Sequence, residues 1–171
     1  MRASIAILLL LMAVPAPAGA AGGDVLLGRL RPEALPGLGP EWAAGRDAYE
    51  PAPEDLRVLA AFPVPATLDV YLGTWCPDSL REVPRLLKIL DLARPEALRV
   101  RFYGIDRTKE RPARLVRRVA LERVPTFVLT VGGREVGRIV EMPETTLEHD
   151  LALLAARAAG PPGPPGPRAG E

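Results

Sequence analysis

The sequence predicts an α/β domain in which helices flank a central mixed β-sheet. Short apolar, strand-like runs alternate with longer amphipathic runs along the chain. The predicted order of elements is strand, helix, strand, helix, strand, strand, helix. The last two strands are separated by Gly132-Gly133, which is a signal for a tight antiparallel hairpin. A helical crossover favours a parallel strand pair and a hairpin adds an antiparallel one, so the sheet should be mixed.

Residues 1–20 are predicted to be a signal peptide rather than part of the fold. Arg2 supplies a positive charge, the run Ile5–Val14 is apolar, and small residues precede a cleavage site before Ala21. The apolar run is too short for a typical bilayer span. Retention of this segment as an uncleaved anchor is the alternative. We expect export, to a periplasm or to the outside of the cell.

Residues 21–63 form a proline-rich N-terminal extension. We expect it to be irregular except for a short helix over residues 53–62, where Pro53 and two acids mark the first turn. Trp42 and Tyr49 are expected to pack this extension against the body of the domain. A substrate-facing Trp42 is the alternative.

Residues 64–159 are predicted to form the domain itself. Strands are expected at residues 67–72, 98–102, 126–131 and 134–140, and helices at residues 79–92, 112–121 and after Pro143. The strand at 98–102 alternates apolar and charged residues, as a half-exposed edge strand does. The last helix should begin with a capping box that runs from Thr145 to Glu148.

Residues 160–171 form a Gly/Pro-rich tail. Its few collagen-like triplets are too short for a triple helix, so we expect it to be disordered.

Charge and cysteine content exclude several classes of function. The 171-residue chain has a formal net charge of +1, and loss of Arg2 with the signal peptide leaves it near zero. This balance disfavours nucleic acid as a partner. A single cysteine cannot form an internal disulfide bond. One Cys and one His lack the spacing of a metal site, so we expect no metal and no cofactor.

The only cysteine lies in the sequence Trp75-Cys76-Pro77-Asp78-Ser79, between a predicted strand and a predicted helix. A thiol at a helix N-terminus meets unpaired N–H groups and the positive end of the helix dipole, and both favour the nucleophilic thiolate. Pro77 suits the first helical turn. The Trp75 ring either shields the sulfur of Cys76 or serves only as a hydrophobic packing residue. Asp78 favours the helix but opposes a nearby thiolate, unless its carboxylate turns outward.

This motif resembles the active site of the thioredoxin superfamily, and the resemblance covers residues 64–159. Pro84 stands where that family often has a kinking proline, and Val124-Pro125-Thr126 stands where it has a cis-proline before the hairpin. The resemblance implies a thioredoxin-like fold with Cys76 as the catalytic residue. It also implies a cis peptide bond before Pro125 and a substrate-binding edge at Val124, Pro125 and Thr126.

Two residues depart from the family pattern. Ser79 replaces the second cysteine, and a hydroxyl can hydrogen-bond a thiolate but cannot resolve a mixed disulfide. Cys76 therefore needs an external thiol, from a small molecule or from a protein partner. The usual buried acid is replaced by Val70, and Asp69 should point to the other face of the sheet as a solvated or N–H-bonded residue rather than a proton shuttle.

The sequence thus favours an exported thiol–disulfide oxidoreductase that uses one cysteine through a mixed disulfide. The main alternative is a non-catalytic binding module that keeps the fold and the docking groove. A one-cysteine peroxidase would need Arg81 and Thr74 close to the sulfur, and the sequence does not place them. A Cys76–His149 dyad is disfavoured because the last helix should lie on a sheet face away from Cys76.

Overall fold

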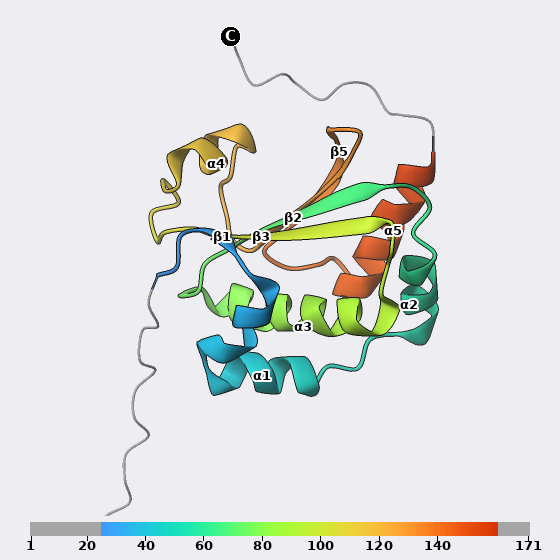
Figure 1. Cartoon of the computed structure of the whole chain (residues 1–171), viewed down its shortest axis with the longest axis horizontal. Coiled ribbons are helices and arrows are strands. Elements are labelled where there is room, and N and C mark those ends of the chain that lie inside the picture. Colours follow the sequence, from blue (N-terminus) through green and yellow to red (C-terminus); the bar gives the residue numbers. More distant parts are fainter. Residues whose placement is uncertain (1–24, 161–171) are drawn as a thin grey trace, which may run out of the picture.

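The computed structural model describes residues 25–160, and its centre is a five-stranded sheet (Figure 1). Only β2 and β3 are parallel, and the other neighbouring pairs are antiparallel. This arrangement confirms the predicted α/β class, in which helices flank a central mixed sheet. In the order β1-β3-β2-β4-β5, with strands numbered along the chain, the sheet contains β1 (Gly28–Leu30), β2 (Ala66–Leu72), β3 (Leu98–Gly104), β4 (Thr126–Val131) and β5 (Arg134–Val140).

The helices divide unequally between the two faces of the sheet. Figure 1 shows α3 beside the sheet with α1 outside it, α5 and α2 nearby, and α4 alone on the opposite side. Two 3-10 turns, Pro32–Ala34 and Pro36–Leu38, precede the first helix. The helices are α1 (Pro40–Asp47), α2 (Pro53–Ala60), α3 (Pro77–Ala93), α4 (Ala113–Arg118) and α5 (Leu147–Ala159).

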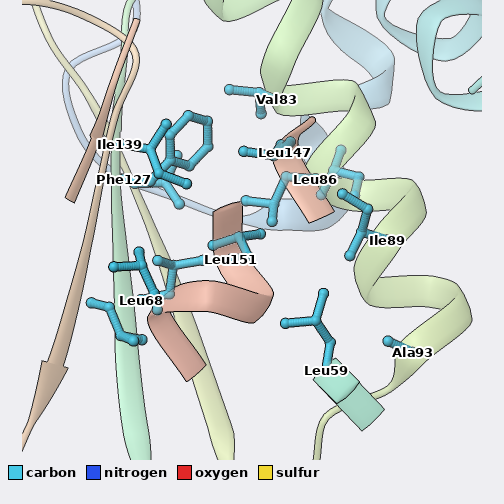
Figure 2. Close-up of a cluster of buried hydrophobic side chains, with 14 of the residues drawn as sticks. Leu59, Leu68, Val83, Leu86, Ile89, Ala93, Phe127, Ile139, Leu147 and Leu151 are labelled. Carbon is cyan, nitrogen blue, oxygen red and sulfur yellow. The ribbon is translucent and has the colours of Figure 1, made fainter. Parts of the chain in front are cut away.

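The main hydrophobic core lies between the sheet and helices α2, α3 and α5. Alternate strand residues point to this face because side chains alternate along a strand, and they meet the helical apolar stripes. Each fully buried aliphatic or aromatic side chain contributes roughly 1.5–3 kcal/mol. Figure 2 shows Leu68, Phe127 and Ile139 of the strands opposite Leu59 of α2, Val83, Leu86, Ile89 and Ala93 of α3, and Leu147 and Leu151 of α5.

A second, smaller cluster lies on the face that α4 covers, and Cys76 belongs to it. Its buried members are Tyr71, Cys76, Tyr103, Ile105, Leu121, Val124 and Val128. Leu115 and Val116 of α4 pack against this cluster together with Val119. No residue of α4 is fully buried, so this six-residue helix only partly covers its face.

The N-terminal extension is not irregular, and this corrects the sequence-based expectation. Its residues Gly28–Leu30 pair with β3, and α1 packs against α3 with Trp42 buried. A side chain at Gly104 would collide with the backbone of Leu26, so glycine is required where the extension crosses β3. Because β1 covers its outer side, β3 is not the predicted edge strand.

The start of α5 also differs from the predicted capping box. The N-cap is Thr146, whose side chain accepts a hydrogen bond from the His149 N–H, one residue later than expected. Glu148 is buried and turns to the extension instead. It accepts hydrogen bonds from the Tyr49 hydroxyl at 2.5 Å and from the Ala52 N–H at 3.1 Å, and so links the extension to α5.

Glu148 should make the stability of the protein depend on acidic pH. Burial by itself would raise the pKa of Glu148, but the hydrogen bonds from Tyr49 and Ala52 outweigh it, and the pKa lies below its ordinary value. The stabilisation is therefore fully present above the unfolded-state pKa of about 4.3 and is lost as pH falls through the folded-state value. We expect the urea midpoint to drop over this range, and to drop less in Glu148→Gln. An equal drop in both proteins would contradict this role.

The expected signal peptide and nearly all of the expected tail lie outside the described residues. Within residues 25–160, no helix combines the length and apolar character that a membrane crossing requires.

Candidate functional site

Cys76 is the N-cap residue of α3. The strand β2 ends at Leu72, a turn follows in which the Cys76 N–H donates to the Gly73 carbonyl at 3.0 Å, and the helix begins at Pro77. The backbone of Cys76 is extended, with φ of −93° and ψ of 125°, while its carbonyl accepts the first helical hydrogen bond from Leu80. The sulfur therefore lies at the N-terminal end of a 17-residue helix, as the sequence predicted.

The thiol of Cys76 is nearly enclosed, with 7% of the residue exposed. Its sulfur donates a hydrogen bond to the backbone carbonyl of Val124 at 3.2 Å. This contact uses the proton of the thiol. The sulfur must give up the contact when it loses its proton to become a nucleophile. It is the only free cysteine of the chain.

Ser79 stands where the expected Cys-x-x-Cys motif would have its second cysteine. Its side chain stabilises the turn that precedes Cys76. Its side chain is fully buried, and its oxygen accepts the Gly73 N–H at 3.1 Å. We expected this hydroxyl to be available to a thiolate at Cys76. The bond that it accepts stabilises the backbone between β2 and α3. It uses the oxygen as an acceptor, so the hydroxyl proton can still be donated to a thiolate.

Trp75 forms one wall of the site. Its indole N–H donates to the Ile105 carbonyl at 3.0 Å, and the Arg107 guanidinium lies over the ring, 5.3 Å from its centroid. This stack is a cation–π contact. No local pattern marks Ile105 or Arg107 as site residues. Both follow β3, which runs parallel to β2 and so ends beside the turn that contains Trp75.

Asp78 and Arg81 form an ion pair at the start of α3, with 2.8 Å between Oδ1 and Nη2. Arg81 also contacts the buried Glu82, whose Oε1 is 2.7 Å from the Arg81 Nε and 3.1 Å from the Arg85 Nη1. Asp78 is partly exposed and is held by Arg81. Because Arg81 is committed to two carboxylates, it gives no support to a peroxidase in which arginine contacts the sulfur.

Val124, Pro125 and Thr126 lie beside Cys76, and all three are buried. The peptide bond between Val124 and Pro125 is cis. The Pro125 carbonyl accepts the Glu141 N–H at 2.7 Å, and the Thr126 hydroxyl donates to the Arg123 carbonyl at 2.7 Å. The carbonyls of Val124 and Pro125 thus both have internal partners. An extended substrate could use the Val124 carbonyl only after the Cys76 thiol leaves it.

Asp69 was expected to be solvated or N–H-bonded, and the structure shows the second: it is buried and bound by guanidinium N–H groups. It lies on the same sheet face as Tyr71 and is 5% exposed. Arg101 binds both of its oxygens, at 2.5 and 2.6 Å, and an Arg118 nitrogen lies 3.8 Å away. Arg118 also donates to the Tyr71 hydroxyl at 3.3 Å, while burial is the main cause that raises the pKa of Tyr71.

His149 lies on α5, which packs in the main core, whereas Cys76 belongs to the cluster on the face that α4 covers. Its ring nitrogen is 3.3 Å from both carboxylate oxygens of Asp55 in α2, so it joins two helices. This position agrees with the sequence argument against a Cys–His dyad. Over residues 25–160, no group of three or more His, Cys, Asp or Glu side chains is placed to hold a metal ion.

Comparison with known proteins supports the fold and does not extend to the chemistry. No family model and no curated protein matches the chain. An HIV epitope-scaffold is similar, with a TM-score of 0.57 and 20% identity over 76% of this chain and 92% of that one. A protein of unknown function from Pseudomonas aeruginosa has a TM-score of 0.52 and 22% identity, and the match covers 74% of this chain and 81% of that one.

A third similar structure is the oxidised mitochondrial thioredoxin 3 of Saccharomyces cerevisiae. Its TM-score is 0.35, with 23% identity over 51% of this chain and 76% of that one. A TM-score of 0.35 does not establish a shared fold. The likeness to the first two structures shows a shared α/β fold and assigns no activity to Cys76.

Proposed function

We propose that this chain is an exported thioredoxin-like protein that uses Cys76 as a single nucleophile in thiol–disulfide exchange. The observation that carries this proposal is the position of the only thiol, at the N-cap of a long helix and against the backbone of Val124. A helix N-terminus favours an anionic sulfur, and an anionic sulfur is the attacking species in exchange. Export rests on the sequence of residues 1–20.

The exchange takes place in two steps. Cys76 first loses its proton to solvent, which ends the hydrogen bond to Val124, and its thiolate attacks one sulfur of a partner disulfide. A mixed disulfide forms as the partner bond breaks, and the second partner sulfur leaves as a thiolate. Ser79 cannot carry out the next step, so an external thiolate attacks the mixed disulfide and releases Cys76.

Proteins or small molecules that bear a thiol or a disulfide are the partners of this reaction, and it requires no metal or cofactor. A second candidate function is a non-catalytic binding module. The low exposure of Cys76 and its bond to the Val124 carbonyl favour this alternative, because both hold the sulfur back from a partner.

The proposal predicts that Cys76→Ser abolishes exchange. The reduced mature protein, mixed with 2,2′-dithiodipyridine at pH 7, should release one equivalent of pyridine-2-thione, and Cys76→Ser should release none. Added thiol should then regenerate free Cys76, as read by intact mass. The native protein should react faster than the same protein unfolded in urea, because only the fold supplies the helix terminus. If Cys76 reacts only after unfolding, the binding module is the better description.

A further inference from the structure

The near-zero net charge of the chain hides a strong separation of charge. Residues 99–140 contain eleven Lys and Arg against four Asp and Glu, a net charge of +7. The other described residues, 25–98 and 141–160, contain nine basic and fifteen acidic residues, a net charge of −6. The first group forms β3, α4, β4 and β5, and the second contains every other helix.

The fold turns this separation into a basic face. The face of the sheet toward α3 and α5 is filled by the apolar core, so most charged strand residues point to the other side. Arg101 is paired across the sheet with Asp69, and Arg138 with Val128, which belongs to the Cys76 cluster. Figure 1 places α4 on this side of the sheet and α1 and α3 on the opposite side. We define the basic face as Arg99, Arg101, Arg114, Arg117, Arg118 and Arg138.

Three of the six arginines of the basic face already bind side chains of this protein. Arg101 binds Asp69, Arg118 binds Tyr71, and Arg138 binds Glu135. By contrast, Arg99, Arg114 and Arg117 are exposed, and over residues 25–160 their side chains have no ion pair or hydrogen bond. Three unpaired guanidinium groups on a half-covered face attract carboxylates from solution, and guanidinium geometry suits two-point contacts with them.

The basic face is continuous with the surroundings of Cys76. Arg114 and Arg117 stand on α4, whose inner residues Leu115 and Val116 pack against the cluster that contains Cys76. Arg107 adds a further positive charge over Trp75, at the wall of the site. An acidic ligand on α4 would therefore lie over the cluster that contains the thiol.

We propose that the basic face docks an acidic segment of a partner polypeptide, which brings a partner sulfur to Cys76. The role of the sulfur rests on the proposed function, and the docking itself does not. A polypeptide is favoured over nucleic acid because the aromatic rings of this face, Tyr71 and Tyr103, are buried and offer no surface on which bases could stack. The field of this face also steers acidic partners toward Cys76 at low salt.

The first test measures docking without the thiol. In a Cys76→Ala background, binding of poly-L-glutamate is compared between Arg114→Glu/Arg117→Glu and Lys88→Glu/Arg157→Glu. The two double variants change the net charge equally, but Lys88 and Arg157 lie on α3 and α5. We expect the α4 variant to weaken binding at least about tenfold, in a salt-dependent way, and the control to change it less than about twofold. Equal effects of the two variants would overturn the docking surface. So would tighter binding of duplex DNA or of phosphatidylglycerol vesicles to the unmodified face.

The second test asks whether docking on the basic face speeds the reaction of a partner disulfide with Cys76. Cysteine peptides activated as pyridyl disulfides, with flanks of either Glu or Lys, are reacted with the reduced protein that retains Cys76. We expect the Glu-flanked peptide to react at least about tenfold faster at low salt, and the Arg114→Glu/Arg117→Glu variant to lose this preference. If both peptides react equally fast, the inference fails while the proposed function stands. If poly-L-glutamate binds but neither peptide reacts, the docking surface stands and the delivery of a sulfur to Cys76 is refuted.

Discussion

Replacing Ser79 with cysteine is expected to shorten the life of a mixed disulfide at Cys76 by at least about a hundredfold in millimolar external thiol. An intramolecular thiol held close to its target acts at an effective concentration far above millimolar. In the native protein this position carries a hydroxyl, which cannot expel the partner thiolate. The substituted protein would form an internal disulfide and release its partner without outside help.

The structure shows why the substitution should be tolerated. Ser79 lies in the first turn of α3 and is fully buried below the turn that ends at Cys76. The main interaction that Ser79→Cys weakens is the hydrogen bond from the Gly73 N–H, because sulfur is a weaker acceptor than oxygen. The cost to the free energy of unfolding should be about 1 kcal/mol. The substituted protein should therefore stay folded while its mixed disulfide decays much faster.

The measurement is the decay of a preformed mixed disulfide with a cysteine peptide, followed by intact mass. Ser79→Ala is the matched control, because it loses the same hydrogen bond and brings no thiol. We expect Ser79→Ala to decay at the native rate and Ser79→Cys to decay faster, with the appearance of an internal disulfide. A Ser79→Cys protein that keeps its partner as long as the control does would show that the two positions cannot react.

Replacing Arg101 with alanine is expected to lower the free energy of unfolding by about 3–5 kcal/mol, the cost typical of breaking a buried ion pair by removal of one partner. Asp69 is 5% exposed, and both of its oxygens are bound by Arg101. Arg118 lies 3.8 Å from one oxygen and donates to the Tyr71 hydroxyl, so it can replace at most part of the lost contacts. The variant leaves a carboxylate buried at the centre of the sheet.

Urea unfolding should show this loss as a lower midpoint with an unchanged slope. Arg99→Ala is the control on the same strand, since Arg99 is exposed and has no ion pair among the described residues, and it should change stability by less than about 0.5 kcal/mol. A second substitution, Asp69→Val in the Arg101→Ala protein, should recover much of the loss because it removes the unpaired charge. A loss below about 1 kcal/mol in Arg101→Ala would refute the buried pair.

Elements with local signals were predicted almost to the residue. The hairpin strands β4 and β5 have the predicted bounds, because Gly132 and Gly133 both adopt positive φ values that suit a tight turn. The helix α3 was predicted from its apolar stripe, and begins two residues before the expected start. Both signals lie within a few residues of the structure that they determine.

Other features depend on residues that are far apart in the chain. The three-residue strand β1 could not be read from its own sequence, because it is defined only by its pairing with β3. For the same reason β3 was wrongly expected to be an edge strand. Asp69 was expected to be either solvated or N–H-bonded, and the sequence could not decide between them. An alternating pattern does not show that Arg101, 32 residues away, lies opposite it.

The sequence by itself determined the α/β class, the position of the only thiol at a helix N-terminus, and the absence of a second thiol to resolve its products. These follow from local periodicity, turn chemistry and composition. Tertiary structure alone decided that the thiol is held by Val124, 48 residues away, and that Ser79 braces the turn. It also decided that dispersed arginines gather on one face. Packing the apolar faces of the helices onto one side of the sheet leaves the charged strand residues only the other side.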